Sequence, residues 1–377
     1  MSFKNLGLPN TLVAALAEQQ YKKAYPIQAK AIPAILKGKN VLGIAKTGSG
    51  KTASFVLPIL SNLQGYTFTK NRHPSALVVV PTRELAVQVS EVFKQFSKAL
   101  FDPVKTMAVY GGVSINPQMM GMNWVKVLVA TPGRLLDLVD SNAVHLSAVE
   151  TLVLDEADKM LNLGFKEEMN RILGLLPKKR QNLLFSATLS PDLDSLSAIL
   201  MKDPVVIKIE NKTTDISQIQ QSSYLVPEEK KGPLLRYLIK TKDISQVLVF
   251  TSSGYKADNV ANKLRKNGIK AAAIHGKKSQ SARNNALNQF KAGNLPVLVA
   301  TDLLSRGIDI DELPYVINYE LPRSPKDYVH RIGRTGRAEA SGIAISFVSP
   351  ESLHHFKVIL KKSKLYVDLI DSATLDL

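Results

Sequence analysis

Two short segments of the chain carry the residue types that nucleotide hydrolysis requires. The first is a glycine-rich loop between an apolar, β-branched run and a helix-like pattern; it reads Ala45-Lys46-Thr47-Gly48-Ser49-Gly50-Lys51-Thr52. In such a loop the glycines let backbone N–H groups wrap phosphates, the final lysine reaches the β and γ oxygens, and the final hydroxyl binds magnesium. The second segment, Asp155-Glu156-Ala157-Asp158, directly follows the apolar run 151–154.

The acidic segment supplies the groups that the loop lacks. A bound triphosphate needs a carboxylate that holds the metal and a base that acts on the attacking water. We assign Asp155 to magnesium, together with Thr52, and Glu156 to the water, which it would orient and deprotonate. Lys51 completes the catalytic set of this half of the chain. The two segments together predict a nucleoside triphosphatase.

Composition and charge indicate a globular protein with a polyanionic partner. The chain has 377 residues, room for about two to three domains, and is 45% hydrophobic and 21% charged. Lys and Arg number 49 against 32 Asp and Glu, which gives a net charge of +17. The excess is shared, with 24 basic against 15 acidic residues through Lys208 and 25 against 17 after it. A basic surface on both halves favours nucleic acid as the partner.

Several classes of protein are disfavoured. The chain has no cysteine, which excludes disulfides and thiolate metal sites and fits an intracellular protein. The first residues lack the apolar core of a signal peptide, and no stretch approaches the eighteen or so apolar residues of a membrane span. We expect a cytoplasmic protein that does not associate with a membrane.

Strand-like and helix-like patterns alternate along the chain. Continuous apolar runs, typical of buried parallel strands, occupy 41–44, 76–80, 104–109, 125–130, 151–154, 182–185, 246–250, 271–274, 296–300, 315–318 and 343–348. Each is followed by a loop and a helical pattern, so we predict an α/β fold of two tandem, doubly wound parallel-sheet lobes. The polar stretch 210–217 has no apolar period and is predicted to be the linker between them.

The most distinctive short sequences all come directly after predicted strands. They begin with Pro81, Tyr110, Thr131, Asp155 and Ser186 in the first half, and with His275 and Thr301 in the second. Ligands of doubly wound sheets bind outside the carboxyl ends of the strands. These sequences therefore predict one site along one edge of each sheet.

With these motifs in this order, the chain resembles the DEAD-box RNA helicases, and is most similar to the bacterial RhlE-type group. The resemblance extends from residue 3 to about residue 348. It implies two RecA-like lobes, with ATP and Mg²⁺ bound between them and RNA across both. The implied boundaries are an adenine-reading motif at 1–29, an ATP-binding lobe at 30–209, a linker at 210–217 and a C-terminal lobe at 218–377.

In the adenine-reading motif, the resemblance assigns Gln28 to the adenine edge, Tyr21 to stacking on the base and Phe3 to support of Tyr21. The chain departs from the family pattern, since Ala24-Tyr25 precede Pro26 and Gln20 stands where glycine is usual. The alternative for Gln28 is a buried residue at an ordinary helix start. Lys46 replaces the usual glutamine of the phosphate loop, and we expect it to point to solvent.

The remaining motifs match family positions that contact RNA or complete the ATP site. The implied RNA contacts, mainly to the sugar-phosphate backbone and with little sequence preference, are Arg83, Gly111, Gly112, Thr131 and Arg134 in the first lobe and Arg283 and Thr301 in the second. The residues implied to couple the two activities are Asp158, Ser186, Thr188 and His330. Arg334 and Arg337 are implied arginine fingers on the γ-phosphate, and Asp309 would accept hydrogen bonds from the ribose hydroxyls.

The resemblance implies ATP hydrolysis on closure of the lobes around ATP and RNA, with local separation of RNA duplexes or remodelling of RNA–protein complexes. Two alternatives stay open: a DNA translocase on the same scaffold, and an RNA clamp that needs ATP for grip but not for turnover. The 155–158 and 330–337 strings argue against a translocase, and the presence of Glu156 argues against a clamp.

Overall fold

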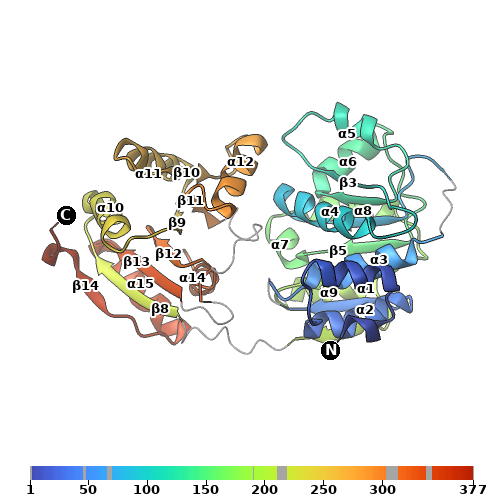
Figure 1. Ribbon diagram of the computed structural model, residues 1–377, viewed down its shortest axis with the longest axis horizontal. Helices are drawn as coiled ribbons and strands as arrows, with labels where there is room; N and C mark the ends of the chain where they lie inside the picture. Colours follow the sequence, from blue (N-terminus) through green and yellow to red (C-terminus); the bar gives the residue numbers. More distant parts are fainter. Residues whose placement is uncertain are drawn as a thin grey trace. The chain divides into compact units, whose positions relative to one another are not determined.

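The computed structural model divides the chain into two units, Met1–Asn211 and Lys212–Leu377, which we call lobe one and lobe two (Figure 1). It describes residues 2–45, 48–65, 70–189, 191–209, 219–302, 313–336 and 342–376. The predicted linker at 210–217 lies outside the described residues, so the domain boundaries stay a prediction.

Lobe one is a seven-stranded parallel sheet in the order β3-β4-β2-β5-β6-β1-β7. Its strands are β1 (Val41–Ile44), β2 (Ala76–Val79), β3 (Thr106–Val109), β4 (Val127–Ala130), β5 (Thr151–Leu154), β6 (Gln181–Ser186) and β7 (Val205–Lys208). Its helices are η1 (Phe3–Leu6), α1 (Asn10–Glu18), α2 (Pro26–Leu36), α3 (Lys51–Asn62), α4 (Arg83–Ser97), α5 (Asn116–Gly121), α6 (Pro132–Asp140), α7 (Ala157–Asn162), α8 (Lys166–Leu175) and α9 (Pro191–Leu200).

The sheet of lobe one separates two hydrophobic clusters. One cluster joins α1 to α4 with the sheet and contains Phe55, Phe93 and Phe185. The other joins α6 to α9 with the opposite face and contains Leu135 and Met160. Strands such as β4 are buried at every position, because helices cover both faces.

Lobe two has the same architecture, a seven-stranded parallel sheet in the order β10-β11-β9-β12-β13-β8-β14. Its strands are β8 (Ile219–Leu225), β9 (Val247–Thr251), β10 (Ala271–Ile274), β11 (Val297–Thr301), β12 (Tyr315–Asn318), β13 (Gly342–Val348) and β14 (Leu369–Asp371). Its helices are η3 (Glu228–Lys230), α10 (Lys231–Thr241), α11 (Gly254–Lys266), α12 (Gln280–Lys291), α14 (Pro325–Ile332), η4 (Pro350–Ser352), α15 (Leu353–Ser363) and η5 (Ser372–Thr374).

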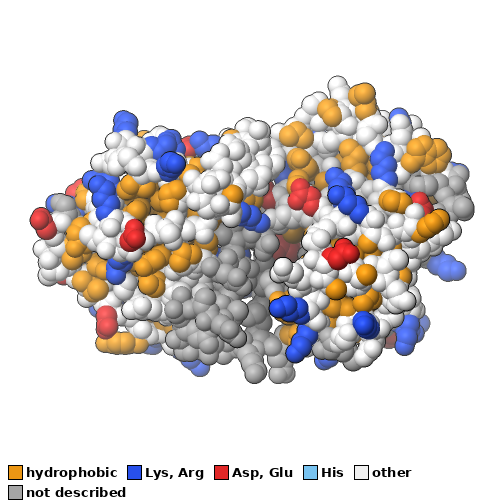
Figure 2. All heavy atoms as spheres, in the orientation of Figure 1, with side chains coloured by type: hydrophobic (Ala, Val, Ile, Leu, Met, Phe, Trp, Pro, Cys, Tyr) orange, Lys and Arg blue, Asp and Glu red, His pale blue; other side chains and the backbone are white. Residues whose placement is uncertain are grey.

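These lobes confirm the predicted α/β fold, and every run predicted as a strand is a strand. Three strands, β7, β8 and β14, were not predicted. On the face drawn in Figure 2, Lys and Arg side chains lie on both lobes, in keeping with the positive charge of both halves of the sequence. Among the described helices, none is long and apolar enough to cross a membrane.

Candidate functional site

The glycine-rich loop connects β1 to α3 at the carboxyl end of the strand. Gly48 and Gly50 have φ angles of +79° and +85°, in the left-handed region that favours glycine. Gly50 is the N-cap of α3, so the unpaired N–H groups of the first helical turn face the loop. This arrangement is a cradle for an anion such as a phosphate chain. Lys46 and Thr47 lie outside the described residues.

Lys51, the first residue of α3, is folded back onto this loop. Its side chain is buried, and its ammonium donates a hydrogen bond of 2.7 Å to the carbonyl oxygen of Ala45. A bound phosphate would offer a charged acceptor in place of that carbonyl. Thr52 follows in the first helical turn and is half-buried.

The acidic segment follows β5, which is separated from β1 in the sheet by β6. Glu156 adopts a left-handed backbone conformation with φ of +53°, and its N–H donates to Asp155 Oδ1 at 2.9 Å. Glu156 Oε1 forms an ion pair of 2.7 Å with Lys159. Both acidic side chains are buried, with Asp155 2% and Glu156 5% exposed.

Burial also alters the ionisation of Asp155. Removal from water raises the pKa of this carboxyl to about 6, with Lys51 lowering it and the neighbouring Glu156 raising it further. Glu156 Oε2 and Asp158 Oδ1 are buried oxygens with no hydrogen-bond partner within the part of the chain that the structure describes. A cluster of buried, partly unpaired carboxylate oxygens fits a bound cation.

The chemistry of this donor set fits Mg²⁺ held jointly by protein and phosphates. Among the described residues, no group of three or more His, Cys, Asp or Glu side chains could hold a metal by itself. Magnesium is commonly bound through one or two protein oxygens plus substrate phosphates. Asp155 and the Thr52 hydroxyl are the residues that would hold it here.

The residues predicted to couple the two activities in lobe one lie together. The Thr188 hydroxyl donates to Asp158 Oδ2 at 2.7 Å, and the Ser186 hydroxyl donates to the Thr188 carbonyl at 2.8 Å. Ser186 ends β6, and its carbonyl accepts from the N–H of Ala45 at 3.0 Å. The acidic segment is thus connected through β6 to the start of the phosphate loop. That last contact could not be predicted from the local sequence.

Gln28 lies against the phosphate loop. Its amide nitrogen donates to the Gly50 carbonyl at 3.1 Å, and its amide oxygen accepts from the Tyr25 N–H at 2.9 Å. The side chain is fully buried. In this conformation the amide connects the start of α2 to the loop, and its contact with adenine stays a prediction.

The aromatic residues of the adenine-reading motif form a row. Tyr21 is half-buried and meets Phe3 edge-on at 6.4 Å and Phe96 edge-on at 5.7 Å, measured between ring centroids. Phe3 therefore packs against Tyr21, and the stacking of Tyr21 on adenine stays a prediction. Gln20, at the position where the family usually has glycine, has φ of +61°, so this chain keeps the left-handed turn without the glycine.

The predicted RNA contacts of lobe one converge at the carboxyl edge of the sheet. The Arg83 guanidinium packs directly on Gly112, whose φ of +76° and missing side chain leave room for it. Arg134 donates from Nη2 to the Val113 carbonyl at 2.9 Å, one residue further along the same loop. Thr131 is the N-cap residue of α6. The structure brings Arg83, Gly111, Gly112 and Arg134 to one loop, 110–114.

The predicted RNA contacts of lobe two lie at its corresponding edge. Thr301 ends β11 and lines a cavity of about 610 Å³ together with residues of the loops after β9, β10 and β12. Arg283, on α12, is buried, and its Nη2 donates to Gln280 Oε1 at 2.6 Å. Arg283 is not among the residues that line the cavity.

The 330–337 string begins on α14. His330 is exposed and Arg334 is 6% exposed, while Arg337 and Asp309 lie outside the described residues. The contacts of His330, Arg334 and Arg337 with the ATP site stay predictions.

Comparison with known proteins identifies the family. A DEAD/DEAH box helicase model matches residues 25–196, and a helicase conserved C-terminal domain model matches residues 229–339. DEAD-box ATP-dependent RNA helicase CshA of Bacillus cereus is 39% identical over 376 residues, which is 100% of this chain and 70% of that protein. The chain belongs to the DEAD-box ATP-dependent RNA helicases. ATP-dependent RNA helicase DeaD of Buchnera aphidicola is 42% identical over 349 residues, 92% of this chain and 57% of that protein.

Solved structures of DEAD-box proteins share the fold. Saccharomyces cerevisiae Dbp5 bound to RNA and ADP BeF3 matches with a TM-score of 0.83 and 29% identity, over 98% of this chain and 95% of that one. A DEAD box protein from Methanococcus jannaschii matches with a TM-score of 0.55 and 36% identity, over 98% and 99%. The predicted tandem RecA-like lobes of a DEAD-box helicase are thereby confirmed.

Two residues of this DEAD-box helicase were missed by sequence reasoning although they build the site. Gln118 accepts from the Tyr110 N–H at 3.0 Å and donates to the Tyr110 and Ser114 carbonyls, which fixes the loop under Arg83. Arg331 donates to both oxygens of Asp302, at 2.5 and 2.7 Å, and its guanidinium lies 4.8 Å from the centre of the Phe250 ring. Arg331 lies within the glycine-rich 330–337 string, but the string does not predict its contact with Asp302.

Proposed function

We propose that this chain hydrolyses ATP when RNA is bound and uses the cycle to separate short RNA duplexes locally or to remodel RNA–protein complexes. The observation that carries the proposal is the buried acidic segment, in which Asp155 and the unpaired oxygen of Glu156 follow a strand two places from the phosphate loop. The solved structure of the related Dbp5 with RNA and ADP BeF3 supports it.

Lobe one holds the nucleotide and its reacting water. Backbone N–H groups of the glycine-rich loop bind the phosphate chain, and Lys51 exchanges the Ala45 carbonyl for the β and γ oxygens. Asp155 and Thr52 would hold Mg²⁺, which neutralises charge on the β and γ phosphates. Glu156 orients the attacking water and takes its proton, and Lys159 holds one carboxylate oxygen of Glu156 in place.

Lobe two supplies the remaining groups of the catalytic site. Arg334 and Arg337 stabilise charge on the γ-phosphate, and Asp309 accepts from the ribose. An arginine finger contributes about 10³–10⁵ in rate, or roughly 4–7 kcal/mol, so hydrolysis is slow until the lobes close. Closure requires ATP and RNA together.

RNA binds along the carboxyl edges of both sheets. Arg83 and Arg134, with close backbone approach at Gly111 and Gly112, contact phosphates in lobe one, and Arg283 and Thr301 do so in lobe two. Such contacts give little sequence preference. A backbone bent to fit two rigid lobes cannot stay paired, which explains local strand separation.

We further propose that the chain is of the RhlE-type group and acts in the cytoplasm, where ATP and RNA are both available. The RhlE-type grouping rests on the same sequence motifs, in the same order along the chain, that predicted the DEAD-box family.

The test is an ATPase assay with no nucleic acid, with single-stranded RNA and with DNA of the same sequence. We expect strong stimulation by RNA alone, because the 2′-hydroxyl is the consistent handle that distinguishes the two. Equal stimulation by DNA would favour a translocase. ATP-dependent RNA binding without turnover would favour a clamp.

A further inference from the structure

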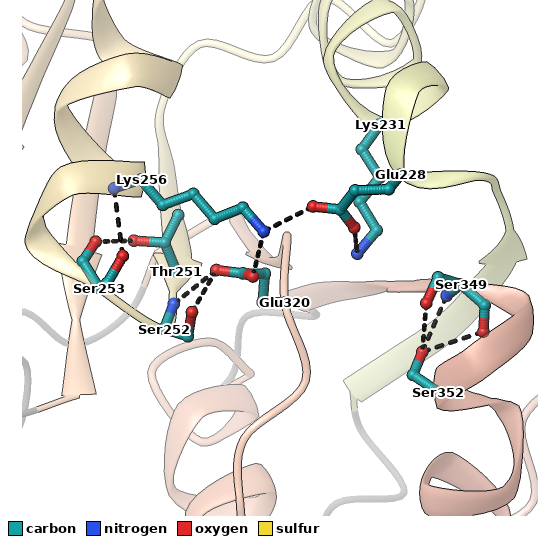
Figure 3. A network of polar contacts seen from close by, with 9 residues as sticks. All are labelled: Glu228, Lys231, Thr251, Ser252, Ser253, Lys256, Glu320, Ser349 and Ser352. Atoms are coloured by element: carbon teal, nitrogen blue, oxygen red, sulfur yellow. Dashed lines mark hydrogen bonds and ion pairs between the residues drawn. The ribbon is translucent and has the colours of Figure 1, made fainter.

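Figure 3 shows an ionic network in lobe two. One of its members, Ser252, also lines the cavity that Thr301 lines. Lys256 places its ammonium between two carboxylates, 2.6 Å from Glu228 Oε1 and 2.6 Å from Glu320 Oε1. Glu228 also pairs with Lys231 at 2.7 Å. The second oxygen of Glu320 accepts from both the N–H and the hydroxyl of Ser252, each at 2.7 Å.

The network joins the loops that follow two adjacent strands. Ser252 follows β9 and Glu320 follows β12, and these strands pair in register with Phe250 opposite Asn318. Both loops line the cavity, the first through Ser252 and Ser253, with Tyr255 at the start of α11 beside them, and the second through Leu321 and Arg323. The spacing of the cavity walls therefore depends on the contacts between Glu320, Ser252 and Lys256.

The charged groups of the network form ion pairs with one another. Burial opposes ionisation of Glu320, but hydrogen bonds from Lys256 and Ser252 lower its pKa, so it is charged at neutral pH. A carboxylate on an RNA-facing edge would by itself repel phosphate. Lys256 offsets that charge, and its ammonium is occupied by two carboxylates.

We propose that Lys256 and Glu320 are positioning residues that set RNA affinity by holding the Ser252–Tyr255 wall of the cavity, without contacting RNA themselves. This inference rests on the proposed RNA-binding function. In this proposal, RNA is recognised in lobe two by the Ser252–Tyr255 wall, which Glu320 holds in place, and by the predicted contact Thr301. Tyr255, which is 78% exposed at the start of α11, belongs to that wall.

The sign of one charge change separates positioning from simple electrostatics. Glu320→Gln removes a negative charge near the RNA edge, so electrostatics alone predicts tighter RNA binding. Positioning predicts the reverse, because the neutral amide is a weaker acceptor for Ser252 and leaves Lys256 with one carboxylate. We expect the RNA concentration for half-maximal ATPase stimulation to rise roughly fivefold to thirtyfold, with the rate at saturating RNA nearly unchanged.

Lys256→Met gives a second readout. If Lys256 only positions Glu320, RNA binding weakens but its dependence on salt keeps the wild-type slope. A lysine that contacted a phosphate would instead lower that slope by about one. Glu229→Gln is the matched control, because Glu229 is the exposed neighbour of Glu228 and the same charge change there leaves the network intact.

Thermal unfolding of each variant shows whether lobe two is folded. If Glu320→Gln does not fold, Ser252→Ala removes only the hydroxyl donor to the same oxygen, and a smaller loss of RNA affinity is expected. Wild-type or tighter RNA affinity in folded Glu320→Gln, or a reduced salt slope in Lys256→Met, would overturn the inference alone. A wild-type ATPase that does not respond to RNA would overturn the proposed function with it.

Discussion

Burial is the main cause of the altered pKa of Asp155, the proposed magnesium ligand. The carboxyl is buried beside Glu156, and its pKa rises to about 6 even though Lys51 lowers it. The folded state therefore favours the protonated form relative to an ordinary aspartate. From this group alone, the free energy of unfolding falls as the pH rises from the ordinary value of 3.8 through about 6. A cation bound by Asp155 would favour the charged form of the carboxyl, so metal and proton would compete for it.

This competition predicts proton release. At pH 6, binding of an ATP analogue with Mg²⁺ should release about half a proton from Asp155, and at pH 8 almost none. Calorimetric titration in two buffers of different ionisation enthalpy measures the release. Asp155→Asn should remove it, whereas Asp137→Asn, an exposed carboxylate on α6, should not. Equal proton release by wild type and Asp155→Asn would show that another group titrates.

Glu156 carries the second residue-scale prediction. Its left-handed backbone and the pairing of Oε1 with Lys159 hold Oε2 in a fixed, buried place. Glu156→Gln keeps the shape but removes the base, so phosphate release should fall roughly 10²–10⁴-fold while ATP-dependent RNA binding persists. Glu167→Gln, on the exposed first turn of α8, is the control. Unchanged turnover in Glu156→Gln would reassign the base.

At the residue scale, the sequence predicts candidate catalytic residues more readily than the buried residues that position them. Lys51, Asp155 and Glu156 are predicted to be catalytic because their spacing from glycines and strands is typical of phosphate chemistry. Arg331 and Gln118 were not, because a buried arginine or glutamine acquires its partners only when distant loops meet. Gln28 was assigned to adenine, and its two contacts within the chain could not be read from local sequence.

Among the elements, the strands that the sequence predicts are those with a continuous apolar run, and they include the edge strands β3 and β10. Continuous apolar runs such as β4 need only local sequence to be recognised. β7 and β14 are edge strands with mostly exposed side chains, and so lack that pattern. β8 contains Gln220, Gln221, Ser222 and Ser223 and is defined by its pairing with β13 and β14. The pairing of β8 with these two strands depends on the tertiary structure, so its local sequence does not predict the strand.

The contact between α2 and the phosphate loop gives the element-scale prediction. Gln28→Ala leaves the Gly50 carbonyl and the Tyr25 N–H without their buried partner, which should cost about 1–3 kcal/mol of lobe-one stability. The thermal midpoint should fall by several degrees. ATP use should weaken, and the preference for ATP over GTP should shrink if Gln28 also reads adenine.

Thermal unfolding without nucleotide and ATPase assays with ATP and GTP separate these two roles. Gln95→Ala, an exposed amide on α4, is the control and should change neither. A stability loss with an unchanged nucleotide preference would leave Gln28 as a structural residue only.

At the scale of the whole molecule, each lobe has its own hydrophobic core. The clusters of lobe one contain only residues up to Ile207, and those of lobe two only residues from Ile219 onwards. Each lobe also has a complete seven-stranded sheet. A unit with its own core and sheet is expected to fold alone. The proposed chemistry, in contrast, is divided, since the phosphate loop and the acidic segment belong to lobe one and the predicted arginine fingers to lobe two.

Cutting the chain within 210–217 should therefore abolish RNA-stimulated ATPase although both lobes fold. Lobe one would keep Lys51, Thr52, Asp155 and Glu156 and should still bind nucleotide weakly. It would lose Arg334 and Arg337, and with them about 10³–10⁵ in rate. Mixing the lobes at micromolar concentration should restore little activity, because the linker supplies an effective concentration in the millimolar range. The measurement is phosphate release at saturating RNA from lobe one, from the mixture and from the intact chain. If lobe one alone responded to RNA as strongly as the intact chain, the division of the site between the lobes would be wrong.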